Sequence, residues 1–376
     1  MALGAEPTIA FYISGHGFGH ASRQVEIINA LAVRCPRVRV LVRSSVARWL
    51  LERTIVFPFE LDERPCDTGI VQIDSLHLDA RATIARAAAF YRTIDERAEA
   101  EAARLRERRV DFVVCDAPPL ACAAAARAGL PSVVIANFTW DWIYEAYTEH
   151  LHEAPDLIPA IRAAYSHASA AWRLPLHGGF AAFDPAHGAP AGALVDVPFV
   201  ARHSTRTRET TRARVGLPQR TRLVLPSFGG YGIDGLDLDA LELPAGWDVV
   251  RGLRHAEIYD AGLSYQDLVR AVDAVITKPG YGIVSECLAN GTPLVYTSRG
   301  RFAEYDVFVG EMPRFLRCAY LDNAALLAGR WREAIAAAVD APAPPERPRT
   351  DGAAVVANMI AACSAGANSS PPPPPR

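Results

Sequence analysis

The sequence has no closely spaced cysteine pair, no long apolar run and no strong excess of charge of either sign. Its seven cysteines are odd in number, include no C-x-x-C pair and fall mostly within apolar runs, so we expect buried, reduced thiols rather than disulfides or zinc ligands. No apolar run is long enough to span a bilayer, and no basic segment leads into a signal-type apolar stretch at the N-terminus. These absences predict a cytoplasmic protein with no transmembrane segment.

The charge balance argues against nucleic acid as a partner. The 376 residues include 39 basic and 42 acidic side chains, for a formal net charge of −3, which is not the footprint of a nucleic-acid-binding protein. Apolar residues make up 50% and charged residues 22%, as in soluble globular proteins. A chain of this length has room for two domains of ordinary size.

Short apolar, β-branched runs alternate with helical segments along the first half of the chain. This alternation predicts a parallel sheet covered by helices on both faces. The expected strands lie at 9–13, 38–42, 110–115 and 131–136, with further candidates at 55–59 and 70–73. The expected helices lie at 21–33, 45–53 and, as one long segment, 79–109.

A second alternating series follows in the other half, with strands expected at 222–225, 247–250, 274–277 and 293–296. Helices are expected at 265–272, from the loop before 283 through 288, and at 307–315 and 324–339. The pattern weakens between about 176 and 220, which indicates a domain boundary. We therefore expect domains at 1–195 and 196–345, a C-terminal helix within 346–365, and a disordered Pro-rich tail at 366–376.

A glycine-rich loop, Ser14-Gly-His-Gly-Phe-Gly-His20, joins the first expected strand to the first expected helix. Its three glycines permit a sharp turn and a close approach of backbone amides to a ligand. Ligands of open α/β sheets bind at this end of the strands. A dinucleotide fingerprint would need a glycine at the position of His20 and an acid after the second strand, so we rank that interpretation lower.

His20 and Asp116 are the candidate acid–base pair. His20 begins the first helix and Asp116 ends another strand of the same half, so both face the same edge of the sheet. A neutral imidazole is a suitable general base near pH 7, typically contributing about 10²–10⁴-fold to the rate, and a carboxylate would orient it. The alternative gives His20 a packing or capping role and makes Asp116 the N-cap of the following helix. The residues alone leave both interpretations open.

Two more glycine-rich loops follow strands in the second half, Ser227-Phe-Gly-Gly230 and Lys278-Pro-Gly-Tyr-Gly282. Free amides at the start of a helix bind phosphate oxygens, and Lys278 would assist. Glu286, one turn into the helix, would accept hydrogen bonds from a ribose. The alternative is that the glycines only form tight turns and that Glu286 is an ordinary first-turn acid. The presence of two such loops favours phosphate binding.

Five ordered motifs between about residues 8 and 340 resemble a known family. They are Tyr-x-x-Gly-His-Gly-Phe-Gly-His-Ala-x-Arg at 12–23, Asp-Phe-Val-Val-x-Asp at 111–116, Asn-Phe-x-Trp-Asp at 137–141, Phe-Gly-Gly at 228–230 and Lys-x-Gly-Tyr-Gly-x-Val-Ser-Glu at 278–286. The arrangement resembles the GT-B glycosyltransferases, and most closely the glycosyltransferase-like N-terminal region of plant L-arabinokinases. No kinase-type phosphate loop follows, so we do not expect a sugar kinase.

This resemblance implies an α/β fold of two Rossmann-like domains facing each other across a cleft, an N-terminal domain for an acceptor and a C-terminal domain for a nucleotide-sugar donor. The implied catalytic residues are His20 and Asp116. The implied acceptor-loop residues are Gly15, His16, Gly17, Phe18, Gly19, Asn137, Trp140 and Asp141. The implied donor-binding residues are Phe228, Gly229, Gly230, Lys278, Gly280, Tyr281, Gly282, Ser285 and Glu286, with Arg301 and Glu304 in place of the acid–amide pair by which many members grip the donor sugar.

The expected function is transfer of a sugar from a nucleotide sugar, with uridine as the expected base, to a hydroxyl of an unknown acceptor. The alternatives are a non-catalytic nucleotide-sugar-binding protein and an enzyme resembling UDP-sugar 2-epimerases. The nucleotide sugar would be a co-substrate, and no tightly bound cofactor is expected. We expect no metal either, because Asp237-Leu-Asp239 lies in a leucine-rich stretch away from the glycine-rich loops.

Overall fold

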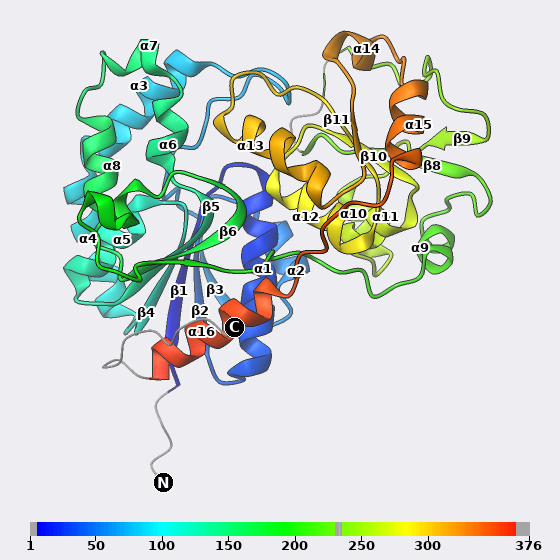
Figure 1. The fold of residues 1–376 in the computed structure, drawn as a ribbon. Coiled ribbons are helices and arrows are strands. Elements are labelled where there is room, and N and C mark those ends of the chain that lie inside the picture. The colour runs from blue at the N-terminus through cyan, green and yellow to red at the C-terminus, as the bar shows by residue number, and fades with distance from the viewer. Residues whose placement is uncertain (1–5, 230–232, 234, 366–376) are drawn as a thin grey trace. The chain divides into compact units, whose positions relative to one another are not determined.

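A computed structural model describes residues 6–229, 233 and 235–365, and the expected Pro-rich tail at 366–376 lies outside these residues. The chain divides into two compact units, each built on its own parallel sheet (Figure 1). The first unit contains the chain up to Val71, Asp79–Val200 and the chain from Asp351 onward. The second contains Gln72–Leu78 and Ala201–Thr350. The expected α/β class is confirmed.

The first unit has a seven-stranded sheet in the order β3-β2-β1-β4-β5-β6-β7, with every pair parallel. Its strands are β1 (Thr8–Ile13), β2 (Arg39–Arg43), β3 (Phe59–Asp62), β4 (Phe112–Asp116), β5 (Ser132–Phe138), β6 (Ala170–Gly178) and β7 (Leu194–Asp196). Every residue of β1, β4 and β5 is buried, which is why these strands are continuous apolar runs in the sequence. The strand order reverses between β1 and β4, where Ile13 pairs with Asp116. Ligands of such sheets bind at this reversal point.

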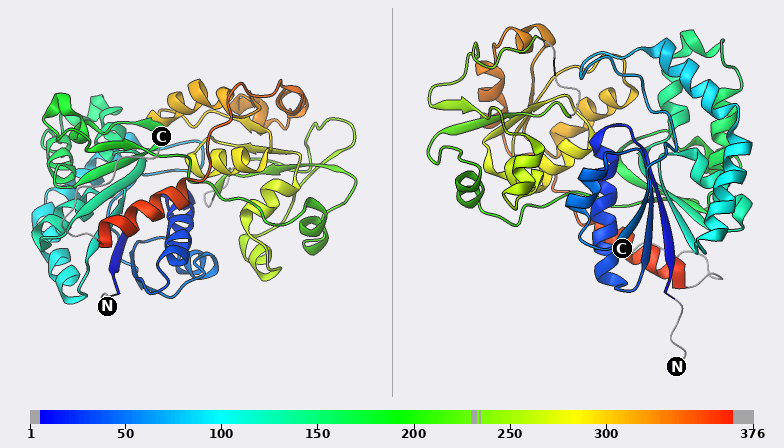
Figure 2. Two further views of the ribbon diagram at one scale, coloured as in Figure 1. Left: turned by 60° about the horizontal axis from the view of Figure 1, so that its bottom comes forward. Right: turned by 180° about the vertical axis from the view of Figure 1, so that it is seen from behind.

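Helices cover both faces of this sheet, with α1, α2 and α16 on one side and α4, α5 and α8 on the other (Figure 1). The helices are α1 (Gly17–Arg34), α2 (Arg48–Thr54), α3 (Ala80–Tyr91), α4 (Ile94–Glu107), α5 (Pro119–Ala128), α6 (Trp140–Glu145), α7 (Thr148–Leu151), α8 (Leu157–Tyr165) and α16 (Gly352–Ala365), with 3-10 turns at Ala181–Phe183 and Pro185–His187. Figure 2 shows α16, in red, beside α1, in blue, although they come from opposite ends of the chain. The C-terminal helix therefore belongs to the first unit.

Three expectations for this unit are wrong. The long helix at 79–109 is two helices, because the backbone leaves the helical conformation at Thr93, the N-cap of α4, where φ is −109° and ψ is 26°. Residues 70–73 are not a strand; only Gln72 forms an isolated bridge, to Leu78. The strand candidate at 55–59 is misplaced, because β3 is Phe59–Asp62. The sequence pattern also missed β6 and β7.

The second unit has a five-stranded parallel sheet in the order β12-β11-β10-β8-β9. Its strands are β8 (Arg222–Pro226), β9 (Trp247–Val249), β10 (Ala274–Thr277), β11 (Leu294–Tyr296) and β12 (Cys318–Tyr320). Its helices are α9 (Arg208–Arg214), α10 (His255–Asp260), α11 (Tyr265–Ala271), α12 (Tyr281–Asn290), α13 (Ala303–Glu311), α14 (Asn323–Leu327) and α15 (Arg332–Asp340), with a 3-10 turn at Met312–Arg314. The expected helix at 324–339 is divided into α14 and α15 by Gly329, which has a φ of 72°.

The segment Gln72–Leu78 comes from the first half of the chain but packs in the second unit. Leu76 is buried in the core of that unit, together with Phe228, Trp331 and Ile335. The Ser75 hydroxyl donates a hydrogen bond to the carbonyl of Phe228 at 2.6 Å. No pattern in the sequence predicts this placement. Among the described helices, none is both long and apolar enough to cross a membrane.

Candidate functional site

His20 and Asp116 form a buried pair at the reversal point of the first sheet. His20 lies in the first turn of α1 and Asp116 ends β4, so the strand register brings them to the same edge. Nδ1 of His20 lies 2.9 Å from Oδ1 of Asp116, and the two residues are 6% and 0% exposed. A proton on Nδ1 that is donated to this carboxylate leaves Nε2 as an acceptor for a substrate hydroxyl.

Arg23 is the third member of this cluster, and the sequence analysis gave it no role. It donates to Oδ2 of Asp116 from Nε at 2.7 Å, to Oδ1 of Asp116 from Nη2, and to Oδ1 of Asn137 from Nη1 at 2.6 Å. Burial raises the pKa of Asp116, but the Arg23 guanidinium, with a smaller contribution from His20, outweighs it and holds that pKa at about 2. Asp116 is therefore ionised at neutral pH.

The loop before α1 combines one close side-chain contact with one positive backbone angle. A Cβ atom at Gly15 would lie 2.0 Å from Oγ of Ser45, so a larger residue there would require the Ser45 hydroxyl to rotate away. Gly17 has a φ of 71° and is the first residue of α1. His16 is the N-cap, with its ring against Trp140 at a centroid distance of 5.8 Å. The last glycine, Gly19, lies within the first turn of the helix.

Asp67 is a second buried carboxylate near His20 that the sequence analysis missed. It is 6% exposed, and its Oδ2 accepts a hydrogen bond from the Trp140 indole at 2.9 Å. Burial raises its pKa; Ser14, His20 and Trp140 oppose this shift, and Asp116 adds to it. The Trp140 ring also lies 6.4 Å from the His20 ring, so both side chains border the same indole.

Two of the expected acceptor-loop residues, Asp141 and Phe18, contact residues other than His20. Asp141 is buried and accepts a hydrogen bond from Nε of Arg162 at 2.9 Å, which ties α6 to α8. Phe18 packs edge-on against Trp49 at 6.1 Å. No contact of either residue with His20 is among those described, so their expected roles at an acceptor stay predictions.

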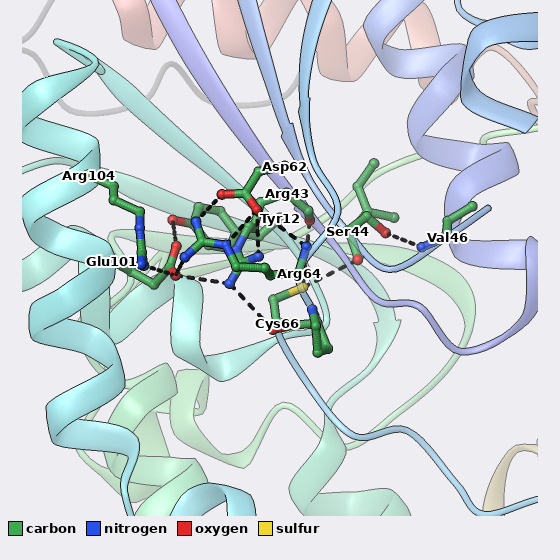
Figure 3. A network of polar contacts seen from close by, with 11 residues as sticks. Tyr12, Arg43, Ser44, Val46, Asp62, Arg64, Cys66, Glu101 and Arg104 are labelled. Carbon is green, nitrogen blue, oxygen red and sulfur yellow. Dashed lines mark hydrogen bonds and ion pairs between the residues drawn. The ribbon is translucent and has the colours of Figure 1, made fainter. Parts of the chain in front are cut away.

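A larger polar network lies at the same edge of the sheet, at the ends of β1, β2 and β3 (Figure 3). Glu101 of α4 accepts hydrogen bonds from the Tyr12 hydroxyl at 3.0 Å, from Arg43 at 3.0 Å and from Arg104 at 2.7 Å. Arg43 in turn donates to Asp62 at 2.9 Å. Burial and then Glu101 raise the pKa of Tyr12 well above its usual range, so its hydroxyl stays a donor. This network fixes α4 against the strand ends that hold the loop before α1.

In the second unit, the two glycine-rich loops lie side by side. They follow the neighbouring strands β8 and β10, and the amide of Ser227 donates to the carbonyl of Ile276 at 2.8 Å. The Thr277 hydroxyl also bonds to the carbonyl of Ser227. Gly229 has a φ of 70°, whereas Gly230 lies outside the described residues. Phe228 is buried in the core of this unit, so its backbone rather than its ring is available to a ligand.

The second of these loops leads into α12. Gly280 is the N-cap in an extended conformation, and Tyr281 begins the helix and is 5% exposed. Gly282 lies in the first turn, where its carbonyl accepts a hydrogen bond from the Ser285 hydroxyl at 3.0 Å. The amides of the first turn of a helix, with the positive end of the helix dipole, suit an anion.

Lys278 precedes this helix and is the only lysine in the sequence. Burial and then the Arg299 guanidinium lower the pKa of Lys278 to about 7, with Asp74 acting in the opposite direction. Nη1 of Arg299 donates to the carbonyl of Pro279 at 3.3 Å and lies 3.8 Å from the buried Glu304. Two basic side chains therefore gather at the start of α12.

The remaining expected donor-binding residues are Glu286, Arg301 and Glu304. Glu286 is buried and forms an ion pair with Arg202, whose Nε donates to Oε1 at 2.8 Å. Burial raises the pKa of Glu286, and Arg202 opposes this. Glu304 pairs with Arg299, whereas Arg301 is exposed. Their expected contacts with the donor sugar stay predictions.

The fold is of the GT-B type. The calicheamicin glycosyltransferase CalG4 superposes with a TM-score of 0.59 at 15% identity, covering 97% of this chain and 100% of that one. A candidate UDP-N-acetylglucosamine 2-epimerase from Listeria monocytogenes has a TM-score of 0.56 at 11% identity, covering 98% and 99%. At these identities the likeness concerns the fold alone, and it confirms the expected GT-B fold.

The chain also has a curated sequence relative, the L-arabinokinase of Arabidopsis thaliana. The two are 32% identical over 336 residues, which is 86% of this chain and 31% of the relative. This match confirms the resemblance that the five motifs indicate. The chain spans about a third of the length of that relative. No protein-family model matches the chain.

Proposed function

We propose that this protein is a glycosyltransferase that moves a sugar from a nucleotide sugar, with uridine as the base, to a hydroxyl of an acceptor. The observation that carries the proposal is the pair formed by His20 and Asp116 at 2.9 Å, buried at the reversal point of the first sheet. Histidine oriented by an ionised carboxylate is the arrangement of a general base.

In this proposal, Nε2 of His20 takes the proton of the acceptor hydroxyl as the acceptor oxygen bonds to the anomeric carbon of the donor sugar. The bond between that carbon and the nucleoside diphosphate breaks, and the diphosphate leaves with the electron pair. Asp116 stabilises the imidazolium that forms. The first turn of α12 and Lys278 would stabilise the charge on the leaving diphosphate.

The first experiment is a thermal-shift screen against a panel of nucleotide sugars, because a ligand that binds the folded state raises its stability whatever the chemistry. Donors that bind are then tested with a collection of hydroxyl acceptors for release of the nucleoside diphosphate. We expect His20→Ala to reduce turnover by about 10²–10⁴-fold while nucleotide binding stays nearly unchanged.

The exposed His187 provides the matched control, since His187→Ala should change neither turnover nor nucleotide binding. An equal loss of binding and turnover in His20→Ala would contradict a role in proton transfer. Binding of a nucleotide sugar without turnover by the unmodified protein would instead indicate a sensor.

A second candidate is a UDP-sugar 2-epimerase, which is favoured by the likeness to the Listeria protein over 98% of the chain. An epimerase would interconvert the sugar of the nucleotide sugar without any acceptor. NMR of the sugar after incubation with the protein alone separates this activity from transfer.

A further inference from the structure

Arg23 lies in contact with both members of the proposed catalytic pair. The residue is 3% exposed, and its guanidinium spans the carboxyl ends of β4 and β5, bonding to Asp116 on the first and Asn137 on the second. Arg23 and His20 are three residues apart on α1, so they project from the same face of the helix. The Nη2 atom of Arg23 lies 2.9 Å from Nδ1 of His20.

The contact between Arg23 and Asp116 is bidentate. Nε bonds to Oδ2 and Nη2 bonds to Oδ1, which is the fork geometry that fixes the plane of a carboxylate. Asn137 holds the other side of the guanidinium and is itself oriented by the carbonyl of Leu176, to which its Nδ2 donates at 3.3 Å. A chain of hydrogen bonds thus runs from β6 to the imidazole.

These contacts bear on which nitrogen of His20 carries the proton. A buried carboxylate with the imidazole as its only partner would be costly to keep ionised. Arg23 supplies the compensating charge, so Asp116 can stay an anion beside a neutral imidazole and accept the proton of Nδ1. The proton can also lie on Nε2, with Nδ1 accepting from Nη2 of Arg23, but two acceptors, Nδ1 and Oδ1, would then face each other at 2.9 Å. With the proton on Nδ1, the Nη2 donor lies 2.9 Å from that nitrogen and donates to Oδ1 of Asp116 instead.

We propose that Arg23 is a positioning residue that holds Asp116 ionised and in one orientation, and thereby keeps the proton of His20 on Nδ1 and Nε2 free to accept. This inference rests on the proposed function for its catalytic consequence, but the protonation state of His20 is a property of the free protein. The two can therefore be tested apart.

The test is ¹⁵N NMR of the histidine side chains in the protein without ligands, with the His20 signal assigned from its loss in His20→Gln among the ten histidines. We expect the unmodified protein to carry the proton on Nδ1 and Arg23→Gln to show a mixture of both tautomers. With an active donor and acceptor pair, Arg23→Gln should lower kcat about 10²-fold with little change in the KM of the donor. Arg34→Gln, an exposed change on the same helix, should alter neither the tautomer of His20 nor kcat.

A proton on Nε2 in the unmodified protein would overturn the proposal, as would an unchanged tautomer in Arg23→Gln. If Arg23→Gln does not fold, Asn137→Leu removes only the outer anchor of the guanidinium and should shift the tautomers in the same direction. A protein that turns over no nucleotide sugar but loses the Nδ1 tautomer in Arg23→Gln would refute the proposed function and retain the positioning role.

Discussion

Glu286 accepts hydrogen bonds from two nitrogens of the Arg202 guanidinium, and both bonds end on Oε1. The two residues are 3% and 6% exposed, so this is a buried ion pair that joins the chain just after the domain boundary to α12. Neither bond uses Oε2. The carboxylate therefore has a structural partner and can still serve as the expected ribose ligand.

The first prediction separates these two roles of Glu286. Removing one partner of a buried ion pair leaves an uncompensated charge, so Glu286→Ala should cost about 3–5 kcal/mol of unfolding free energy. Glu286→Gln keeps an acceptor for Arg202 and should cost less. If Glu286 binds the ribose, Glu286→Gln should weaken the binding of UDP but not that of its 2′,3′-dideoxy analogue, as measured by calorimetry.

The exposed Glu333 provides the control, since Glu333→Gln removes one acid from the same unit without breaking a buried pair. Equal weakening of both nucleotides by Glu286→Gln would show that the carboxylate acts through Arg202 and the fold of the site. It would exclude a direct contact with the ribose hydroxyls.

The second prediction concerns the pH dependence of donor binding. Burial and Arg299 hold the pKa of Lys278 at about 7, so the amine is partly neutral in the free protein at neutral pH. A diphosphate bound beside it would favour the ammonium form and raise its pKa, so the complex binds more protons than the free protein. Affinity for UDP should therefore fall as the pH rises above 7, by up to about tenfold per pH unit.

Calorimetry in buffers of different ionisation enthalpy measures this proton uptake directly. Because Lys278 is the only lysine, reductive ¹³C-methylation also gives a single lysine signal whose titration can be followed with and without UDP. Lys278→Met should bind UDP more weakly and without the pH dependence above 7. Proton uptake that persists in Lys278→Met would assign the effect to another group.

The sequence predicts well those features that depend on local patterns. The strand at 274–277 is found at those residues because it is a short apolar run between polar neighbours. The loop before α1 and the start of α12 are also predicted, since glycine and strand ends mark them. The same reasoning placed His20 and Asp116 at one edge, because parallel strands share their carboxyl ends.

Features that depend on partners far along the chain are not predicted. The run of arginines at 202–214 has the composition of a solvated helix face, yet Arg202 and Arg212 are buried because Glu286 and Asp273 lie opposite them. Asp67 lies in a stretch without periodicity, and its hydrogen-bond partner Trp140 lies 73 residues further along the chain. Such pairs have no signature in the spacing of a single sequence, because each residue is an ordinary surface type until its partner is known.

The third prediction concerns Asp67 and the stability of the first unit. Burial raises its pKa in the folded state, so the folded protein binds this proton more tightly than the unfolded chain does. The stability that this group contributes is present below its ordinary pKa and is lost as the pH rises through the folded value. Asp67→Asn removes the ionisation but keeps an acceptor for the Trp140 indole. The unfolding temperature of Asp67→Asn should therefore rise relative to that of the unmodified protein between pH 4 and pH 8.

Thermal unfolding followed by near-ultraviolet circular dichroism measures this difference, since Trp140 lies in the affected cluster. The exposed Asp156 provides the control, and Asp156→Asn should show no such trend. A relative stability of Asp67→Asn that falls with pH would mean that the ionised carboxylate is the favoured form. In that case His20, Ser14 and the indole together outweigh burial, and Asp67 would be a second anion beside the imidazole at neutral pH.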